Sequence, residues 1–146
     1  MGSKKIQFVI DSDLANVSLV GMAVNKICSQ IPLSDMESYS VELCVVEAVN
    51  NSILHAYGNK RGKPVEISFV LHSDRLILEI CDEGTPMGQE KLDRRDVFSF
   101  DPDDIETIPE GGRGLAIIRE VMDSVAYRTK DGKNYFTLTK KINCQT

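Results

Sequence analysis

The stretch from Val41 to Tyr57, VELCVVEAVNNSILHAY, decides the fold of this chain. Its dense run of Val, Leu, Ile, Cys and Ala predicts a helix that is buried almost all the way round. One polar stripe interrupts the apolar surface, because Glu47, Asn51 and His55 recur every four residues and therefore stack on one face. A carboxylate and an amide at that depth are costly unless something pairs with them. The partner is either another side chain or a bound metal ion or ligand, and this helix alone leaves both open.

Composition limits the class of protein. A chain of 146 residues with 42% hydrophobic and 27% charged residues is typical of one soluble globular domain that buries a core of its own. The net charge of −5, without any run of Lys or Arg, argues against a nucleic-acid-binding surface. Because no apolar run approaches membrane length and the N-terminus lacks a signal-peptide core, we expect no membrane association and a cytoplasmic location.

The cysteines agree with a reducing compartment. Cys28, Cys44, Cys81 and Cys144 are far apart and form no C-x-x-C pair, which argues against a zinc site. The first three lie in apolar stretches and are predicted to be inert thiols of the core.

Hydrophobic periodicity outlines the secondary structure. A first helix at roughly residues 14–30 is capped by Asp11 or Ser12, and a capping box of Ser34 and Glu37 begins the helix that Gly58 ends. A short third helix is expected at residues 114–122. The predicted strands are residues 4–10, 65–72, 75–81, 124–129 and 135–142. Since strands come in sequential pairs, the predicted class is α+β: a two-layer α/β sandwich with a mixed, mainly antiparallel sheet and helices on one face.

One segment, residues 82–112, has neither a helical nor a strand period. It is acidic, contains three prolines, begins in Asp-Glu-Gly (82–84) and ends in Gly-Gly-Arg-Gly (111–114). A connection of that length within a compact domain is usually a functional lid or a disordered linker. Glycines at both ends favour a lid, because they let the backbone turn sharply or approach a ligand closely.

The two ends of this segment also carry candidate chemistry. Gly-Gly-Arg-Gly opens into a helix, where free N–H groups and the helix dipole favour a phosphate. Asp82, at the end of a buried strand, can accept a hydrogen bond from an exocyclic amine such as that of adenine. Each of these two features alone is also explained by an ordinary turn. Together with the polar stripe, however, they provide the groups that a site for a nucleotide phosphate and Mg²⁺ requires. Asn51 offers an oxygen ligand for Mg²⁺, and Glu47 is placed to take a proton from a hydroxyl group or water.

Three segments together, EAVNNSILHAY (47–57), DEGTP (82–86) and GGRGLAI (111–117), resemble the ATP-binding boxes of the Bergerat-fold ATPases, which include gyrase, sensor histidine kinases and mismatch-repair ATPases. The residues of these boxes and the length of the chain are most similar to those of the bacterial anti-sigma factor serine kinases. The sequence lacks a Walker-type phosphate loop, which excludes an ordinary P-loop NTPase. The resemblance implies the Bergerat ATP-binding fold and a single histidine-kinase-like ATPase domain over residues 1–146, with an ATP lid at about residues 85–111.

The resemblance also assigns roles within the site. It implies that Glu47 is the general base, that Asn51 binds Mg²⁺, that Asp82 binds the adenine amine and that Gly84 shapes the adenine pocket. His55 lies in the first box, but we expect it to pack or to form a hydrogen bond in the core. The residues expected to contact the phosphates are Gly112, Arg113, Gly114 and Leu115.

Three positions depart from the family pattern. Thr85-Pro86 follows Gly84 where a second glycine is frequent, although several anti-sigma relatives also carry proline there. The last strand usually begins with Gly-Thr, whose threonine helps to hold adenine, and Asn134 is the candidate substitute for it here. The first helix carries Asn16 where an arginine often contacts the partner.

The resemblance implies an ATP-dependent and Mg²⁺-dependent serine kinase that phosphorylates an anti-anti-sigma factor, binds a sigma factor to block transcription, and acts as a homodimer. Two alternatives remain: a nucleotide-binding regulatory module without phosphotransfer, and a detached catalytic domain of a histidine kinase. Intact Glu47 and Asn51 favour an active kinase, whereas Asn134 and Asn16 leave room for the first alternative. The second ranks last, because no helix pair with a phosphoacceptor histidine precedes the boxes.

Overall fold

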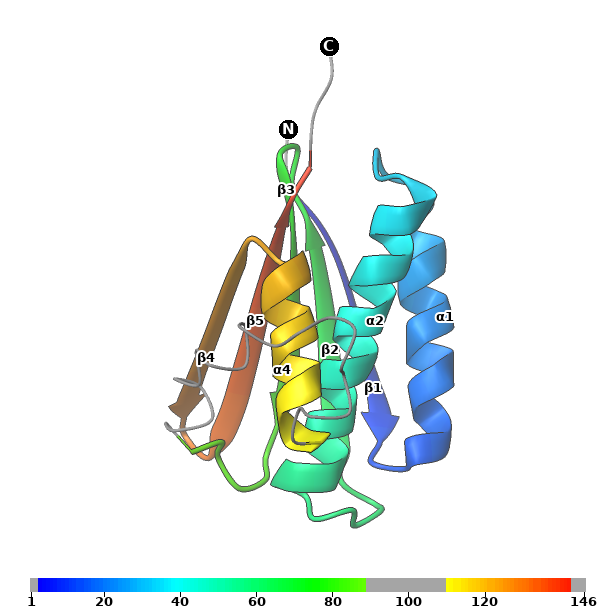
Figure 1. Cartoon of the computed structure of the whole chain (residues 1–146). Helices are drawn as coiled ribbons and strands as arrows, with labels where there is room; N and C mark the ends of the chain where they lie inside the picture. Colours follow the sequence, from blue (N-terminus) through cyan, green and yellow to red (C-terminus); the bar gives the residue numbers. More distant parts are fainter. Residues whose placement is uncertain (1–2, 89–109, 143–146) are drawn as a thin grey trace.

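The described part of the chain folds into two layers, with a sheet of five strands on one side and three helices on the other (Figure 1). The computed structural model describes residues 3–88 and 110–142, with side chains from residue 114 onward in the second range. The strands are β1 (Lys4–Asp11), β2 (Pro64–Leu71), β3 (Arg75–Asp82), β4 (Ser124–Lys130) and β5 (Lys133–Lys141). Their order in the sheet is β1-β2-β3-β5-β4. All four pairings between these strands are antiparallel, which confirms the α+β sandwich and the mainly antiparallel sheet. The expected mixed character is wrong for the described strands, because each of them pairs only with antiparallel neighbours.

The helices are α1 (Val17–Cys28), α2 (Asp35–Asn51) and α4 (Glu110–Val121). The predicted capping box begins α2: the Glu37 N–H donates to Ser34 Oγ at 3.0 Å, and the Ser34 N–H donates to Glu37 Oε1 at 3.0 Å. In the described ranges no helix is both long and apolar enough to span a lipid bilayer.

The predicted cap of the first helix is wrong. A 3-10 turn, η1 (Leu14–Asn16), precedes α1, and Asp13 caps it by accepting the Ala15 N–H at 3.0 Å. Ser12 is instead fully buried and accepts the Lys63 N–H at 3.0 Å. Its hydroxyl is drawn away from the helix because it satisfies backbone groups of the loop before β2, which local sequence cannot reveal.

The core lies between the helices and the covered face of the sheet. Strands β2, β3 and β5 alternate buried and partly exposed residues, as expected of a sheet with one covered face. Helix α2 runs through the centre of the helical layer, and its buried residues are Ser38, Val41, Cys44, Val45, Ala48 and Val49. The predicted core thiols Cys28, Cys44 and Cys81 are buried and free.

The place of β5 in the sheet determines where the site forms. Strands β4 and β5 are joined by a tight turn in which Asp131 and Gly132 both have positive φ, the conformation that favours Asp-Gly in two-residue hairpins. Strand β5 then inserts between β4 and β3, so that Asn134 at its start pairs with Asp82 at the end of β3. This pairing brings residues that are 52 positions apart to one edge of the core.

Candidate functional site

The C-terminal end of α2 changes pitch where the site begins. A π-helical turn, η2 (Ser52–Ala56), continues the helix, and the Tyr57 N–H donates to the Ser52 carbonyl at 3.0 Å. The Ala56 carbonyl accepts instead the N–H of Thr85, at 2.9 Å. Isolated π-helical turns occur frequently at functional sites because they redirect groups at a helix end. Here the turn anchors the segment that follows β3 to the end of the long helix.

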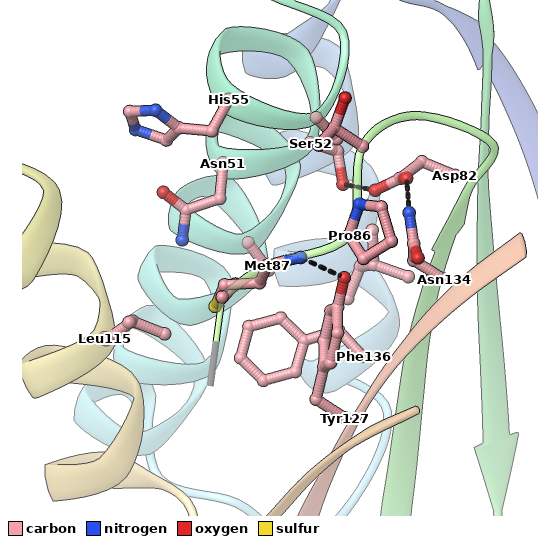
Figure 2. Close-up of a pocket in the computed structure, with 15 residues that line it drawn as sticks. Asn51, Ser52, His55, Asp82, Pro86, Met87, Leu115, Tyr127, Asn134 and Phe136 are labelled. Carbon is pink, nitrogen blue, oxygen red and sulfur yellow. Dashed lines mark hydrogen bonds between the residues drawn. The ribbon is translucent and has the colours of Figure 1, made fainter. Parts of the chain in front are cut away.

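Asp82 is the polar centre of this edge of the core. Its side chain is buried, with 6% exposure, and three protein groups donate to it. Ser52 Oγ donates to Oδ2 at 2.8 Å, and Asn134 Nδ2 donates to Oδ1 at 2.7 Å (Figure 2). The Gly84 N–H also donates to Oδ1, at 3.0 Å. A carboxylate oxygen has room for a second donor, and among the described residues Oδ2 has one donor, Ser52. Asp82 can therefore accept an exocyclic amine without losing its present partners.

Asn134 is held as firmly as Asp82 and is 2% exposed. Besides donating to Asp82, its Nδ2 donates to the Gly84 carbonyl at 3.0 Å, and its Oδ1 accepts the Thr129 hydroxyl at 2.8 Å. Both N–H donors are therefore used within the protein. Its predicted contact with adenine stays a prediction, and what the geometry directly provides is support for Asp82 and for the backbone at Gly84.

Gly84 is required by the space around it. A Cβ at this position would overlap the carbonyl group of Ala56, which is backbone and cannot move aside. The close approach permits the Thr85 N–H to reach Ala56. Gly84 thus shapes the pocket from behind, while the residues after it, Thr85 to Gly88, line the pocket itself.

The pocket beside Asp82 has an apolar wall that sequence motifs did not indicate. Tyr127 of β4 accepts the Met87 N–H on its hydroxyl at 2.7 Å and packs edge-on against Phe136 of β5, with 6.0 Å between ring centroids. Figure 2 shows Met87 beside these two rings, with Leu115 of α4 across the pocket. The lining residues are Ala48, Asn51, Ser52, His55, Ala56, Ile80, Asp82, Thr85, Pro86, Met87, Gly88, Leu115, Tyr127, Asn134 and Phe136. An apolar cleft with one buried carboxylate suits a flat ring that carries an amino group.

The polar stripe of α2 lies partly in this pocket. Asn51 lines it, and its Nδ2 is buried without a hydrogen-bond partner in the described part of the chain. His55 also lines it but is exposed, so the expected core packing or core hydrogen bond of His55 is wrong. Ser52 and Ile53 of η2 remain buried, whereas His55 lies on the exposed face of this turn and points away from Asp82 (Figure 2).

Glu47, one turn before Asn51, is partly buried and lies against α4 at Gly114. Partial burial raises the pKa of its carboxyl above the ordinary value, because desolvation disfavours the charged form. A raised pKa brings a carboxylate closer to the basicity that a general base needs.

The glycine run forms the first turn of α4. The helix begins at Glu110, and not at Gly114 as predicted, since the glycines adopt helical conformation themselves. The first N–H groups of a helix lack intrahelical partners, so an anion can still bind there. Leu115 is buried and lines the pocket. The side chains of residues 112 and 113, and most of the predicted lid (residues 89–109), lie outside the described residues.

Among the described residues, no group of three or more His, Cys, Asp or Glu side chains is arranged to hold a metal ion. Mg²⁺ usually takes one or two oxygen ligands from protein and the others from phosphates and water. Asn51 lines the pocket, and its side-chain oxygen is the atom that would bind the ion.

The chain belongs to the histidine kinase-like ATPase domain family, whose family model matches residues 10–140. It is 26% identical over 140 residues to Serine-protein kinase RsbW of Listeria monocytogenes, covering 95% of this chain and 88% of that protein. It is 29% identical over 140 residues to Anti-sigma F factor of Clostridium kluyveri, covering 96% and 94%. These relatives confirm the resemblance to the anti-sigma factor serine kinases of the Bergerat-fold superfamily.

Solved structures support the same fold. A chain of the SiaB–SiaC complex of Pseudomonas aeruginosa has a TM-score of 0.57 at 13% identity, covering 92% of this chain and 89% of that one. The histidine kinase AdeS of Acinetobacter baumannii has a TM-score of 0.51 at 22% identity, covering 93% and 68%.

Proposed function

We propose that this protein is an ATP-dependent serine kinase that acts as an anti-sigma factor. It phosphorylates an anti-anti-sigma partner and sequesters a sigma factor. The observation that carries the proposal is the position of Glu47 and Asn51, one turn apart on α2, beside a pocket whose polar end is Asp82. Relatives named Serine-protein kinase and Anti-sigma F factor, similar over nearly the whole chain, support the choice of reaction and partners.

The pocket provides separate places for the parts of ATP. The adenine ring would lie against the apolar wall of Ile80, Tyr127 and Phe136, with its amino group donating to Asp82. The phosphates would lie toward the first turn of α4, where Gly112, Arg113 and Leu115 are the candidate contacts. Asn51 would bind Mg²⁺, which when bound neutralises charge on the phosphates.

The proposed transfer uses Glu47 as its base. Glu47 accepts the proton of a serine hydroxyl as that oxygen attacks the γ-phosphorus. A new oxygen–phosphorus bond forms on the serine, the bond to the β–γ bridging oxygen breaks, and ADP leaves with the electron pair. The proton that Glu47 accepted returns to solvent.

The acceptor in this proposal is a serine of another protein. Residues 1–146 would act as one ATPase domain with its lid at about residues 85–111, in the cytoplasm and as a homodimer. The family resemblance implies an arginine for partner contact at the position of Asn16. Here the Asn16 Nδ2 donates at 3.1 Å to the Asp11 carbonyl, ahead of α1. That side chain is thus occupied locally, so the sigma-factor contact would rely on other residues of this surface.

The decisive experiment is a transfer assay with Mg²⁺, γ-labelled ATP and candidate anti-anti-sigma proteins from the host organism. Label should appear on one serine of such a protein and disappear when the serine is replaced by alanine. Gel filtration should show that the unphosphorylated partner binds and that the phosphorylated partner does not, because the added charge would face an acidic protein loaded with nucleotide. ATP binding without transfer to any such partner would reject the kinase and leave the regulatory module.

A further inference from the structure

The backbone conformation at position 114 does not require a glycine. Gly114 lies within α4, and its φ is not in the left-handed region that favours glycine. In the interior of a helix, glycine is less favourable than alanine, because it loses more conformational freedom on folding. The explanation must therefore lie in the space around it.

The nearest atoms in that space belong to a single side chain. A Cβ at position 114 would lie 2.8 Å from Glu47 Oε2, 3.5 Å from Glu47 Cβ and 3.7 Å from Glu47 Cδ. The three nearest atoms all belong to the proposed general base. Gly84 differs in kind, because there the obstructing atoms belong to the backbone of Ala56.

The two helices are fixed around this contact. One turn along the same interface, the Cys44 thiol donates to the Ile117 carbonyl at 4.0 Å. Leu115 and Ile118 of α4 are buried in the core, so α4 cannot simply move away from α2. Helix α4 lies beside α2 over this region (Figure 1).

We propose that Gly114 is a positioning residue for Glu47: its missing side chain leaves the space that the carboxylate occupies between α2 and α4. This inference rests on the proposed function, and it gives Gly114 a role other than the phosphate contact expected of the glycine run. The flank of α4 closes one side of the carboxylate and restricts the positions it can take. The partial burial of Glu47 and the raised pKa of its carboxyl agree with such shielding.

The substitution Gly114→Ala tests the proposal directly. The atom that must give way is the end of a flexible side chain, so the fold should persist while the carboxylate is displaced. We expect the melting temperature to be unchanged or higher, the Kd for Mg-ATP to stay within about threefold, and phosphotransfer to fall at least about tenfold, as for other displaced catalytic groups.

Gly21→Ala is a matched control. Gly21 also lies in a helix, α1, and its Cβ would lie 3.0 Å from Val46 Cγ2 and 3.2 Å from Glu42 Oε2, both of α2. Neither residue belongs to the proposed site, so phosphotransfer per folded protein should remain at the wild-type level.

A double-mutant cycle with Glu47→Ala separates the two possible roles of Gly114. If Gly114 serves Glu47, adding Gly114→Ala to Glu47→Ala should change neither ATP affinity nor residual transfer by more than about twofold. If Gly114 serves the phosphates, the substitution should weaken ATP binding by the same factor in both backgrounds, which would overturn the proposal. Wild-type transfer by Gly114→Ala would overturn it as well.

A readout that does not need transfer keeps the inference separate from the proposed function. The pKa of Glu47, measured by NMR on protein with ¹³C-labelled glutamate, should move toward its ordinary value in Gly114→Ala, because the displaced carboxylate turns to solvent. An unchanged pKa would contradict the positioning role even in a protein that transfers no phosphate. Absence of transfer in the wild type, together with the expected pKa change, would reject only the kinase.

Discussion

Asp82 and Asn134 face each other across β3 and β5, and Asn134 Nδ2 donates to Asp82 Oδ1 at 2.7 Å. The same amide group donates to the Gly84 carbonyl, so one side chain fixes both the carboxylate and the backbone that turns behind the pocket. The resemblance to the Bergerat-fold ATPases implies a Gly-Thr pair at the start of this strand. Here an amide supplies two donors where a threonine hydroxyl would supply one.

Asn134→Asp should destabilise the fold in a pH-dependent way. It replaces a donor by a second buried carboxylate, so we expect the free energy of unfolding at neutral pH to fall by about 2–4 kcal/mol. Repulsion raises the folded-state pKa of the pair above the unfolded value. The loss should therefore be present at neutral pH and shrink as the pH falls and one carboxyl binds a proton. Urea unfolding at about pH 7 and pH 4 measures both.

Thr129→Ala is the control for that experiment. It removes one hydroxyl that donates to Asn134 at an exposed position, so it should cost about 1 kcal/mol or less at either pH. Equal stability of Asn134→Asp and the wild type at neutral pH would show that the pair is not held as described.

Glu47→Gln should separate ATP binding from transfer. The amide keeps the shape of the side chain but cannot accept the proton, so transfer should fall by roughly 10²- to 10⁴-fold while the Kd for ATP changes little. The acid limb of the wild-type pH–rate profile should lie above the ordinary carboxyl pKa of 4.5, since burial raises the pKa of Glu47. Wild-type rates in Glu47→Gln would exclude this residue as the base.

The same substitution should stabilise the fold at neutral pH. Because the folded-state pKa of Glu47 is raised, the protonated form is favoured on folding, and its ionisation weakens the fold as the pH rises through that pKa. Glu47→Gln removes this cost. Its melting temperature should exceed that of the wild type at about pH 7, and the difference should narrow toward pH 4.

Asn51→Ala should weaken only the part of ATP binding that depends on Mg²⁺. Calorimetry with Mg-ATP should show a loss of about tenfold or more, whereas titration in EDTA should show nearly equal affinities. Asn51→Asp, which keeps an oxygen ligand, should retain more of the Mg²⁺-dependent binding than Asn51→Ala. Equal weakening with and without Mg²⁺ would argue for a direct contact with nucleotide.

Gly84→Ala should lower stability and ATP binding far more than the addition of one methyl group would suggest. Its Cβ would overlap the Ala56 carbonyl, so the segment after β3 must shift and the Thr85 N–H loses its partner. We expect a loss of about 2 kcal/mol or more in stability together with loss of ATP binding. Gly132→Ala controls for backbone strain, because Gly132 has positive φ but no atom within 4 Å of its Cβ. It should lower stability by about 1–2 kcal/mol and leave ATP binding intact.

Local sequence patterns were sufficient to predict much of the fold. Apolar periodicity predicted α2 and the paired strands, and the capping-box motif predicted that Ser34 and Glu37 begin α2. These signals depend on neighbours a few residues apart. The first cap and the start of α4 were misplaced. In the first case Ser12 bonds to a distant loop, and in the second glycines that favour a loop adopt the first turn of a helix.

The candidate site, like the fold, was predictable from the sequence only in part. The sequence by itself determined the fold class and the side chains that share one helix face, Glu47 and Asn51, since helical spacing alone places them together. Only the tertiary structure decided that Asn134 bonds to Asp82, that Tyr127 and Phe136 wall the pocket, and that Gly114 leaves room for Glu47. These contacts join residues far apart in the chain, and they depend on the order of strands in the sheet and on the distance between packed helices. No local pattern of residues encodes either quantity, because both are set by how the whole core packs.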